Sequence, residues 1–267
     1  MTQLANDNIR KAVREQYGKV AESGNSGCGC SATSCCDESG SDAKATSMEL
    51  GYSSSDVNHV PEGSNMGLGC GNPKAIASLQ SGETVLDLGS GGGFDAFLAV
   101  QEVGESGTVI GVDMTPEMVS KSRANAEKAG YTNTDFRLGE IENLPVADSL
   151  VDVIISNCVI NLSPEKAKVF QESYRVLKPG GRLAISDVVA TAELPEKLKS
   201  DMALFTGCMS GASSIIEIET MLKDAGFEAI AIKPKDESRE FIRNWVPESK
   251  IEDYVVSATI EAIKPKA

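Results

Sequence analysis

A glycine-rich turn directly after a short apolar run is the feature that most constrains how this 267-residue chain can fold. The apolar run 85–88 is followed by Gly89-Ser90-Gly91-Gly92-Gly93, and an amphipathic segment then starts at Asp95. Glycine permits a tight turn and lets the backbone come close to a ligand. The pattern therefore predicts a buried strand, a ligand-binding turn and a helix, which together form the first unit of a nucleotide-binding α/β fold.

Short runs rich in β-branched residues alternate with amphipathic segments along the rest of the chain. We expect strands at residues 84–88, 108–112, 134–138, 151–156, 182–189, 228–232 and 254–263. The expected helices are 95–103, 116–129, 164–177 and 214–225. Thr115-Pro116 and Ser163-Pro164 have the residue types of helix starts, and 178–181 (Lys-Pro-Gly-Gly) has those of a helix end. This alternation predicts an α/β fold with a mainly parallel sheet and helices on both faces.

Composition changes along the chain and suggests four parts. Residues 1–22 show near-helical spacing of apolar residues as far as Gly18, and residues 23–64 are rich in Gly, Ser and Cys. We expect an N-terminal helix (1–22), a flexible linker or lid (23–64) and a ligand-binding core (65–190). Residues 191–267 would complete the sheet and cover the substrate site.

Acidic residues outnumber basic ones, 39 to 25, which gives a formal net charge of -14. A chain with this charge repels nucleic acid and anionic membrane surfaces, so we expect a small neutral or cationic ligand instead. The apolar stretches are far shorter than the roughly 20 residues of a membrane-spanning helix, and the start of the chain lacks the apolar region of a signal peptide. We therefore expect a cytoplasmic protein, and a monomer.

A second acidic residue supports a nucleoside pocket at the glycine turn. Asp113 ends the second predicted strand, about 20 residues after Gly93, where a carboxylate can accept both ribose hydroxyls. Phe94 occupies the position at which a dinucleotide-binding turn requires glycine or alanine. A nicotinamide-dependent oxidoreductase is therefore disfavoured. A glycine turn that serves only the fold and binds no ligand is also less favoured than a nucleoside pocket.

The seven cysteines point to ligand-binding or reactive thiols, because disulfides are rare in a reducing compartment. Cys70 lies just before the first predicted strand, Cys158 just after the fourth, and Cys208 in the segment after the fifth. Elements placed in this way bring all three to the carboxyl edge of the sheet. Thiolates without histidine favour zinc, copper(I) or a metalloid. Three of them suit trivalent arsenic, whose lone pair takes the fourth direction.

The glycine turn and its neighbours resemble class I S-adenosylmethionine-dependent methyltransferases. In that family an acidic residue, here Asp87, ends the first strand before G-x-G-x-G, and the ribose acid corresponds to Asp113. Segments 138–145, 151–157 and 177–181 continue the resemblance, which covers residues 65–190. It implies a Rossmann-like, mainly parallel sheet of seven strands whose last strand is antiparallel. It also implies that the following residues bind the cofactor: Asp87, Gly89, Gly91, Gly93, Asp113, Met114, Glu140, Ile141 and Asn157.

Segments 65–73, 155–162 and 206–208 resemble arsenite methyltransferases more specifically. That family binds arsenite through cysteines at the positions of Cys70, Cys158 and Cys208, so the resemblance implies that these thiolates bind arsenic(III) and act in catalysis. Cys158 and Cys208 would form the central pair, while Cys70 would add a thiolate or later form a disulfide. Arsenite or its thiol conjugates would be the substrate, and a thiol reductant such as thioredoxin or glutathione would be the partner.

Two other functions stay open at this point. Segment 144–148 also resembles methyltransferases that act on small organic molecules such as quinones or sterols. A non-catalytic protein that binds arsenic or a soft metal could use the cysteines of the N-terminal tail: Cys28, Cys30, Cys35 and Cys36. Their spacing matches no standard zinc framework, so a flexible reservoir of thiols and a defined site are both compatible with it.

Overall fold

The sheet has the strand order β3-β2-β1-β4-β5-β7-β6 in the computed structural model, which describes residues 2–23, 43–199, 202–246 and 249–266. The strands are β1 (Thr84–Leu88), β2 (Thr108–Asp113), β3 (Thr134–Leu138), β4 (Val151–Asn157), β5 (Leu177–Ala190), β6 (Glu228–Lys235) and β7 (Val255–Ile263). Strands β1 to β5 pair in parallel, whereas β7 is antiparallel to both β5 and β6. The predicted Rossmann-like sheet with an antiparallel last strand is confirmed.

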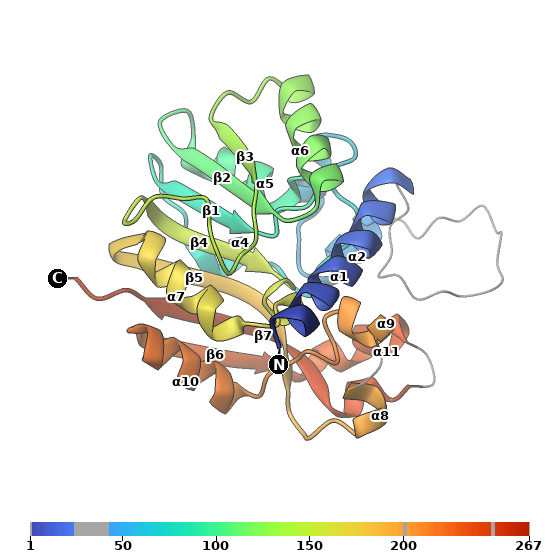
Figure 1. The fold of residues 1–267 in the computed structure, drawn as a ribbon. Coiled ribbons are helices and arrows are strands. Elements are labelled where there is room, and N and C mark those ends of the chain that lie inside the picture. The colour runs from blue at the N-terminus through green and yellow to red at the C-terminus, as the bar shows by residue number, and fades with distance from the viewer. Residues whose placement is uncertain (1, 24–42, 200–201, 247–248, 267) are drawn as a thin grey trace.

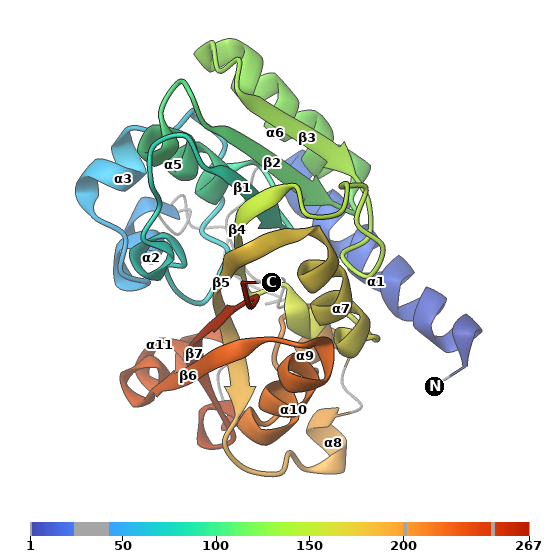
Figure 2. The same cartoon turned by 90° about the vertical axis from the view of Figure 1, so that its left-hand side faces the viewer.

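Helices cover both faces of this sheet (Figure 1, Figure 2). One face packs against α4 (Lys74–Ala77), α5 (Phe94–Val103) and α6 (Pro116–Ala129), and the other against α7 (Lys166–Val176) and α10 (Ile215–Ala225). The remaining α-helices are α1 (Gln3–Ser23), α2 (Ala43–Glu49), α3 (Ser54–Asn58), α8 (Glu196–Lys199), α9 (Met202–Thr206) and α11 (Arg239–Trp245). Short 3-10 helices are η1 (Ile160–Leu162), η2 (Asp236–Ser238) and η3 (Ile251–Asp253). Within the described ranges, no helix is both long enough and apolar enough to span a membrane.

Local sequence signals determine the elements that surround the glycine turn. Helix α6 has Thr115 at its N-cap and Pro116 in its first turn, as predicted, and it ends at Gly130 in the left-handed conformation. The central strands β1 and β4 read as nearly continuous apolar runs because both of their faces are covered by helices. These elements hold the turn and the end of β4 next to each other.

Two predicted boundaries on the α7 side are wrong. Helix α7 begins at Lys166 instead of Pro164, because Glu165 has φ −131° and ψ 54°, outside the helical region, and forms the N-cap. The Ser163 hydroxyl accepts the Glu165 N–H (3.0 Å) and donates to Glu142 (2.7 Å). Residues 178–181 do not form a turn before the next strand. They belong to β5, where the Gly180 N–H donates to the Lys264 carbonyl at 2.9 Å.

Helix α1 lies where an N-terminal helix was expected at residues 1–22. It continues past Gly18 to Ser23, and its last turn packs Val20 and Ala21 against Met118 of α6. The segment after it differs from its prediction. Residues 43–64, which we expected to be part of a flexible segment, include α2 and α3. Here Tyr52 is buried in a small apolar cluster that local sequence did not reveal. The tail cysteines at 28–36 lie outside the described residues.

Candidate active site

The glycine turn leaves β1 and crosses the end of β2 before α5 begins. The backbone N–H groups of Gly89 and Ser90 both donate to the Val112 carbonyl, at 2.7 and 3.1 Å. Gly89 has a φ of +67°, and a Cβ there would lie 2.3 Å from a methyl carbon of Val159. Only glycine fits such a position, where the conformation is left-handed and the space is filled. The turn therefore packs closely against Val159, and its backbone can come close to a ligand in the way the glycine pattern predicts.

Asp113 braces the turn from the end of β2. One carboxylate oxygen accepts the Gly91 N–H at 3.0 Å, and the other accepts the Thr115 N–H at 2.8 Å. Burial raises the pKa of Asp113, and these two hydrogen bonds lower it again in part. Its carboxylate thus shapes the turn and also faces the pocket beside it.

Two further carboxyl groups are buried on the β1 side of the turn. Asp87 is 3% exposed, and burial together with the charges of Asp95 and Asp113 raises its pKa well above the usual range. One of its oxygens has no hydrogen-bond partner. Burial also raises the pKa of Asp95 to about 6. A pocket with clustered acids and an unsatisfied carboxyl oxygen suits a ligand that brings positive charge and hydrogen-bond donors.

Asn157 connects these acids to the loop that carries Cys70. Its side-chain N–H₂ lies within hydrogen-bond distance of the Asp95 carboxylate (3.2 Å) and of the Gly71 carbonyl (2.9 Å). Its side-chain oxygen accepts the Cys70 N–H at 3.0 Å. The Tyr52 hydroxyl donates to Asp95 at 2.5 Å, which ties the segment before the core to the same network. Asn157 is thereby part of both the acidic side and the thiol side of the site.

The three predicted cysteines of the core lie together. The Cys208 thiol donates to the Cys158 carbonyl at 2.6 Å, and the thiols of Cys158 and Cys208 also contact each other. The sulfur atoms of Cys70 and Cys158 and an oxygen of Asp187 all lie within 4.8 Å of one another. Three thiols from a loop, a strand end and the segment after α9 therefore form one cluster at the carboxyl edge of the sheet.

Hydrogen bonds and burial raise the pKa of the Cys158 and Cys208 thiols. The Cys208 hydrogen bond lowers the pKa of Cys158, but the hydrogen bond to Cys70 and burial together raise it well above the ordinary value. The hydrogen bond with Cys158, followed by burial, raises the pKa of Cys208. A soft ligand that replaces the thiol protons would remove the cost of burying thiolates.

Most residues expected to bind the cofactor or substrate line a single pocket. They are Asp87, Gly89, Gly91, Asp113, Met114, Ile141, Asn157, Cys158 and Cys208. The other three lie behind its wall or outside it. Gly93 is the N-cap of α5 and packs against Phe97. Cys70 belongs to the thiol cluster but is buried and does not line the pocket. Glu140 forms ion pairs with Arg10 and Arg14 of α1.

Sequence reasoning missed several residues of the pocket wall. Arg10 and Tyr17 reach it from α1, and Asp95 reaches it from the start of α5. Trp245 makes a tilted ring contact with Phe241 and also lines the pocket. Asp95 follows the glycine turn directly and could have been considered, but an acid in the first turn of a helix is common for electrostatic reasons alone.

The fold, the glycine turn with its two acids, and the pocket define a methyltransferase of the class I S-adenosylmethionine-dependent kind. Residues 79–226 match the methyltransferase domain family. The chain is 54% identical over 266 residues to the arsenite methyltransferase of Halobacterium salinarum, covering 97% of this chain and 67% of that protein. It is 40% identical to the arsenite methyltransferase of Aquipseudomonas alcaligenes, covering 82% of this chain and 62% of that protein. The chain belongs to the arsenite methyltransferase family.

A solved structure agrees with this membership. The arsenic(III) S-adenosylmethionine methyltransferase of Chlamydomonas reinhardtii superposes with a TM-score of 0.60 and 33% sequence identity, covering 85% of this chain and 74% of that one. The chain thus spans about two thirds of the two curated relatives named above and about three quarters of this structure.

Proposed function

We propose that this chain transfers a methyl group from S-adenosylmethionine to trivalent arsenic, supplied as arsenite or its thiol conjugates and bound by Cys70, Cys158 and Cys208. One observation carries the proposal. The acids around the glycine turn and the thiols of Cys158 and Cys208 face the same pocket, so donor and acceptor would meet inside it. Membership of the arsenite methyltransferase family supports the same conclusion.

The cofactor site has the donors and acceptors that this methyl donor requires. Asp113 would bind the ribose, the turn at Gly89 and Gly91 would face the ligand, and Met114 and Ile141 would border the adenine. The unsatisfied oxygen of Asp87 fits an amino group or a nearby cationic centre. When bound, S-adenosylmethionine supplies an electrophilic methyl group on a positively charged sulfur.

The thiols bind arsenite without needing a separate base. As each As–S bond forms, the thiol proton leaves with one arsenic hydroxyl as water, so three thiols and one arsenite give a tris-thiolate and three waters. Raised thiol pKa values do not oppose this exchange, because no free thiolate is required. The bound arsenic keeps its lone pair. Holding arsenic at the pocket wall next to the methyl donor replaces an encounter between two free molecules. In well-oriented reactions this lowers the barrier by roughly 7 to 11 kcal/mol.

Turnover requires a supply of electrons. Transfer of the methyl group to the arsenic lone pair would release S-adenosylhomocysteine and leave arsenic formally pentavalent. Two of the three thiolates would then leave arsenic together as a disulfide, and the two electrons of the broken As–S bonds would return it to the trivalent state. The Cys158 thiol contacts both Cys208 and Cys70, so Cys158 can form this disulfide with either of them. A thiol reductant such as thioredoxin or glutathione would then reduce the disulfide. A reducing compartment such as the cytoplasm suits this chemistry, and the monomeric state stays a prediction.

The test is methyl transfer from labelled S-adenosylmethionine by the full chain, with a thiol reductant and with arsenite or a demethylated quinol as acceptor. We expect labelled methylarsenicals that depend on arsenite. Label in the quinol alone would overturn the proposal in favour of an organic substrate. Bound arsenite and bound cofactor without any transfer would overturn it in favour of a protein that only binds arsenic.

A further inference from the structure

Helix α1 runs from beside α9 to beside α6 (Figure 1). Residues on this helix line the pocket between its cofactor side and its thiol side. The C-terminal turns of α1 pack against α6, where the Lys121 ammonium donates to the Ala21 carbonyl at 3.0 Å. Its middle contacts α9, just before Cys208. Three residues spaced along one face of this helix, Arg10, Val13 and Tyr17, line the pocket. Helix α1 is therefore part of the pocket wall.

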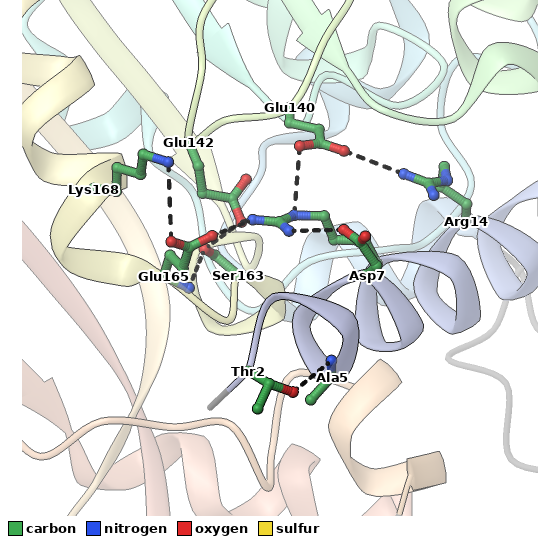
Figure 3. A network of polar contacts seen from close by, with 10 residues as sticks. Thr2, Ala5, Asp7, Arg14, Glu140, Glu142, Ser163, Glu165 and Lys168 are labelled. Carbon is green, nitrogen blue, oxygen red and sulfur yellow. Dashed lines mark hydrogen bonds and ion pairs between the residues drawn. The ribbon is translucent and has the colours of Figure 1, made fainter.

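Arg10 fixes the position of α1 by ion pairs with the core. Its guanidinium lies 2.6 Å from Glu165, 3.2 Å from Glu142 and 3.5 Å from Glu140. Figure 3 shows these three carboxylates gathered around a single side chain of α1, with Arg14 next to Glu140. Arg10 and Glu142 are both buried, so water screens this pair little, whereas Glu140 and Glu165 are more than one-third exposed and contribute less. This anchor does not involve Tyr17.

Tyr17 lies about two helical turns after Arg10 and reaches the thiol side. Its hydroxyl donates to the Thr206 carbonyl at 3.2 Å, and it also forms a hydrogen bond with the Cys208 side chain. Cys208 itself has a φ of +64°, which a residue with a side chain rarely adopts unless its surroundings hold it there. The hydroxyl thus holds the segment that presents the Cys208 sulfur to Cys158.

We propose that Tyr17 is a positioning residue for Cys208, so that docking of α1 completes the arsenic site as well as the wall of the cofactor pocket. The inference rests on the proposed function, because it assigns Tyr17 a role in presenting one of the arsenic-binding thiols. The positioning role belongs to the Tyr17 hydroxyl alone. The Tyr17 ring packs against apolar neighbours on both sides, and a phenylalanine would keep that packing.

The variant Tyr17→Phe removes only this hydroxyl, and Tyr131→Phe is its matched control. The Tyr131 ring stacks on Phe97 beside α6, away from the thiols. Equilibrium dialysis of the full-length chain would give the arsenite Kd, and calorimetry would give the S-adenosylmethionine Kd. We expect Tyr17→Phe to weaken arsenite binding about three- to tenfold, as the loss of one hydrogen bond predicts, and to raise the KM for arsenite. Its cofactor affinity should stay within about twofold of the unaltered chain, and Tyr131→Phe should change neither affinity.

The results separate the inference from the function on which it rests. If the unaltered chain binds and methylates arsenite but Tyr17→Phe binds it equally well, Tyr17 has no positioning role and the inference is wrong. A parallel loss of arsenite and cofactor affinity in Tyr17→Phe would also overturn it, because α1 would then act only as a structural support. If the unaltered chain does not bind arsenite, the proposed function itself fails.

Discussion

Gly69 precedes Cys70 in the loop that contacts Asn157. Because glycine has no side chain, the Asn157 amide can lie close to the backbone at this position. Its φ is +119°, and a Cβ would come within 2.7 Å of the Asn157 amide nitrogen. The same amide group accepts the Cys70 N–H and lies within hydrogen-bond distance of Asp95. A single methyl group at position 69 would therefore disturb both the acids and the thiols.

This contact predicts the effect of Gly69→Ala. We expect a loss of about 2 to 3 kcal/mol in the free energy of unfolding, from backbone strain plus the displaced Asn157, together with weaker arsenite binding. Urea unfolding and arsenite dialysis would measure the two effects. Gly51→Ala is the control, because Gly51 has a φ of +96° but open space around its Cβ position. Equal losses in the two variants would mean that the contact with Asn157 has no effect.

The place of a residue on the pocket wall was predictable from sequence when the residue lies at a strand end. It was not predictable when the residue reaches the wall through the packing of α1 on the core. Asp87, Asp113 and Cys158 lie at or just beyond the carboxyl ends of strands, so a correct reading of the strands places them on the pocket wall. Tyr17 and Arg10 reach the same wall only because α1 packs across segments more than 100 residues away in sequence. No local pattern in residues 1–22 encodes that packing.

The docking of α1 depends on one buried ion-pair cluster. We expect Arg10→Met to lower the free energy of unfolding by about 2 to 4 kcal/mol, because the buried Glu142 carboxylate would lose the cation that it pairs with. Arg14→Met, which removes an ion pair that is more than one-third exposed on both sides, should cost less than about 1 kcal/mol. Chemical denaturation of both variants would measure this, and a similar small loss in each would contradict the anchoring role of Arg10.

At the scale of elements, boundaries were predictable where local chemistry decided them. Pro116 and Gly130 begin and end α6 as their conformational preferences dictate. The start of α7 was not predictable in this way, because Ser163 serves a hydrogen bond to Glu142 from another segment. The helices α2 and α3 were also missed, although Ser53 and Asp56 form a capping box at the start of α3. Leu50 and Tyr52, which lie between these helices, pack on α5, and that packing is not visible in the local sequence.

At the scale of the whole molecule, the order of the strands brings distant parts of the chain to one edge. Because β1 lies between β2 and β4, Asp87, Asp113 and Cys158 become neighbours even though other elements separate them in sequence. Sequence alone predicted this edge from the alternation of strands and helices. It did not predict that α1 covers one side of this edge; the segment around Trp245, within residues 191–267, lines the pocket from another side.

The most direct test of the account is a crystal structure of the full chain with arsenite and S-adenosylhomocysteine, using anomalous scattering to locate arsenic. The account predicts one arsenic bound by the sulfur atoms of Cys70, Cys158 and Cys208, in the same pocket as a ligand whose ribose contacts Asp113. Arsenic held instead by the tail cysteines, or located away from the ligand's sulfur, would contradict the claim that the core thiols bind the methyl acceptor.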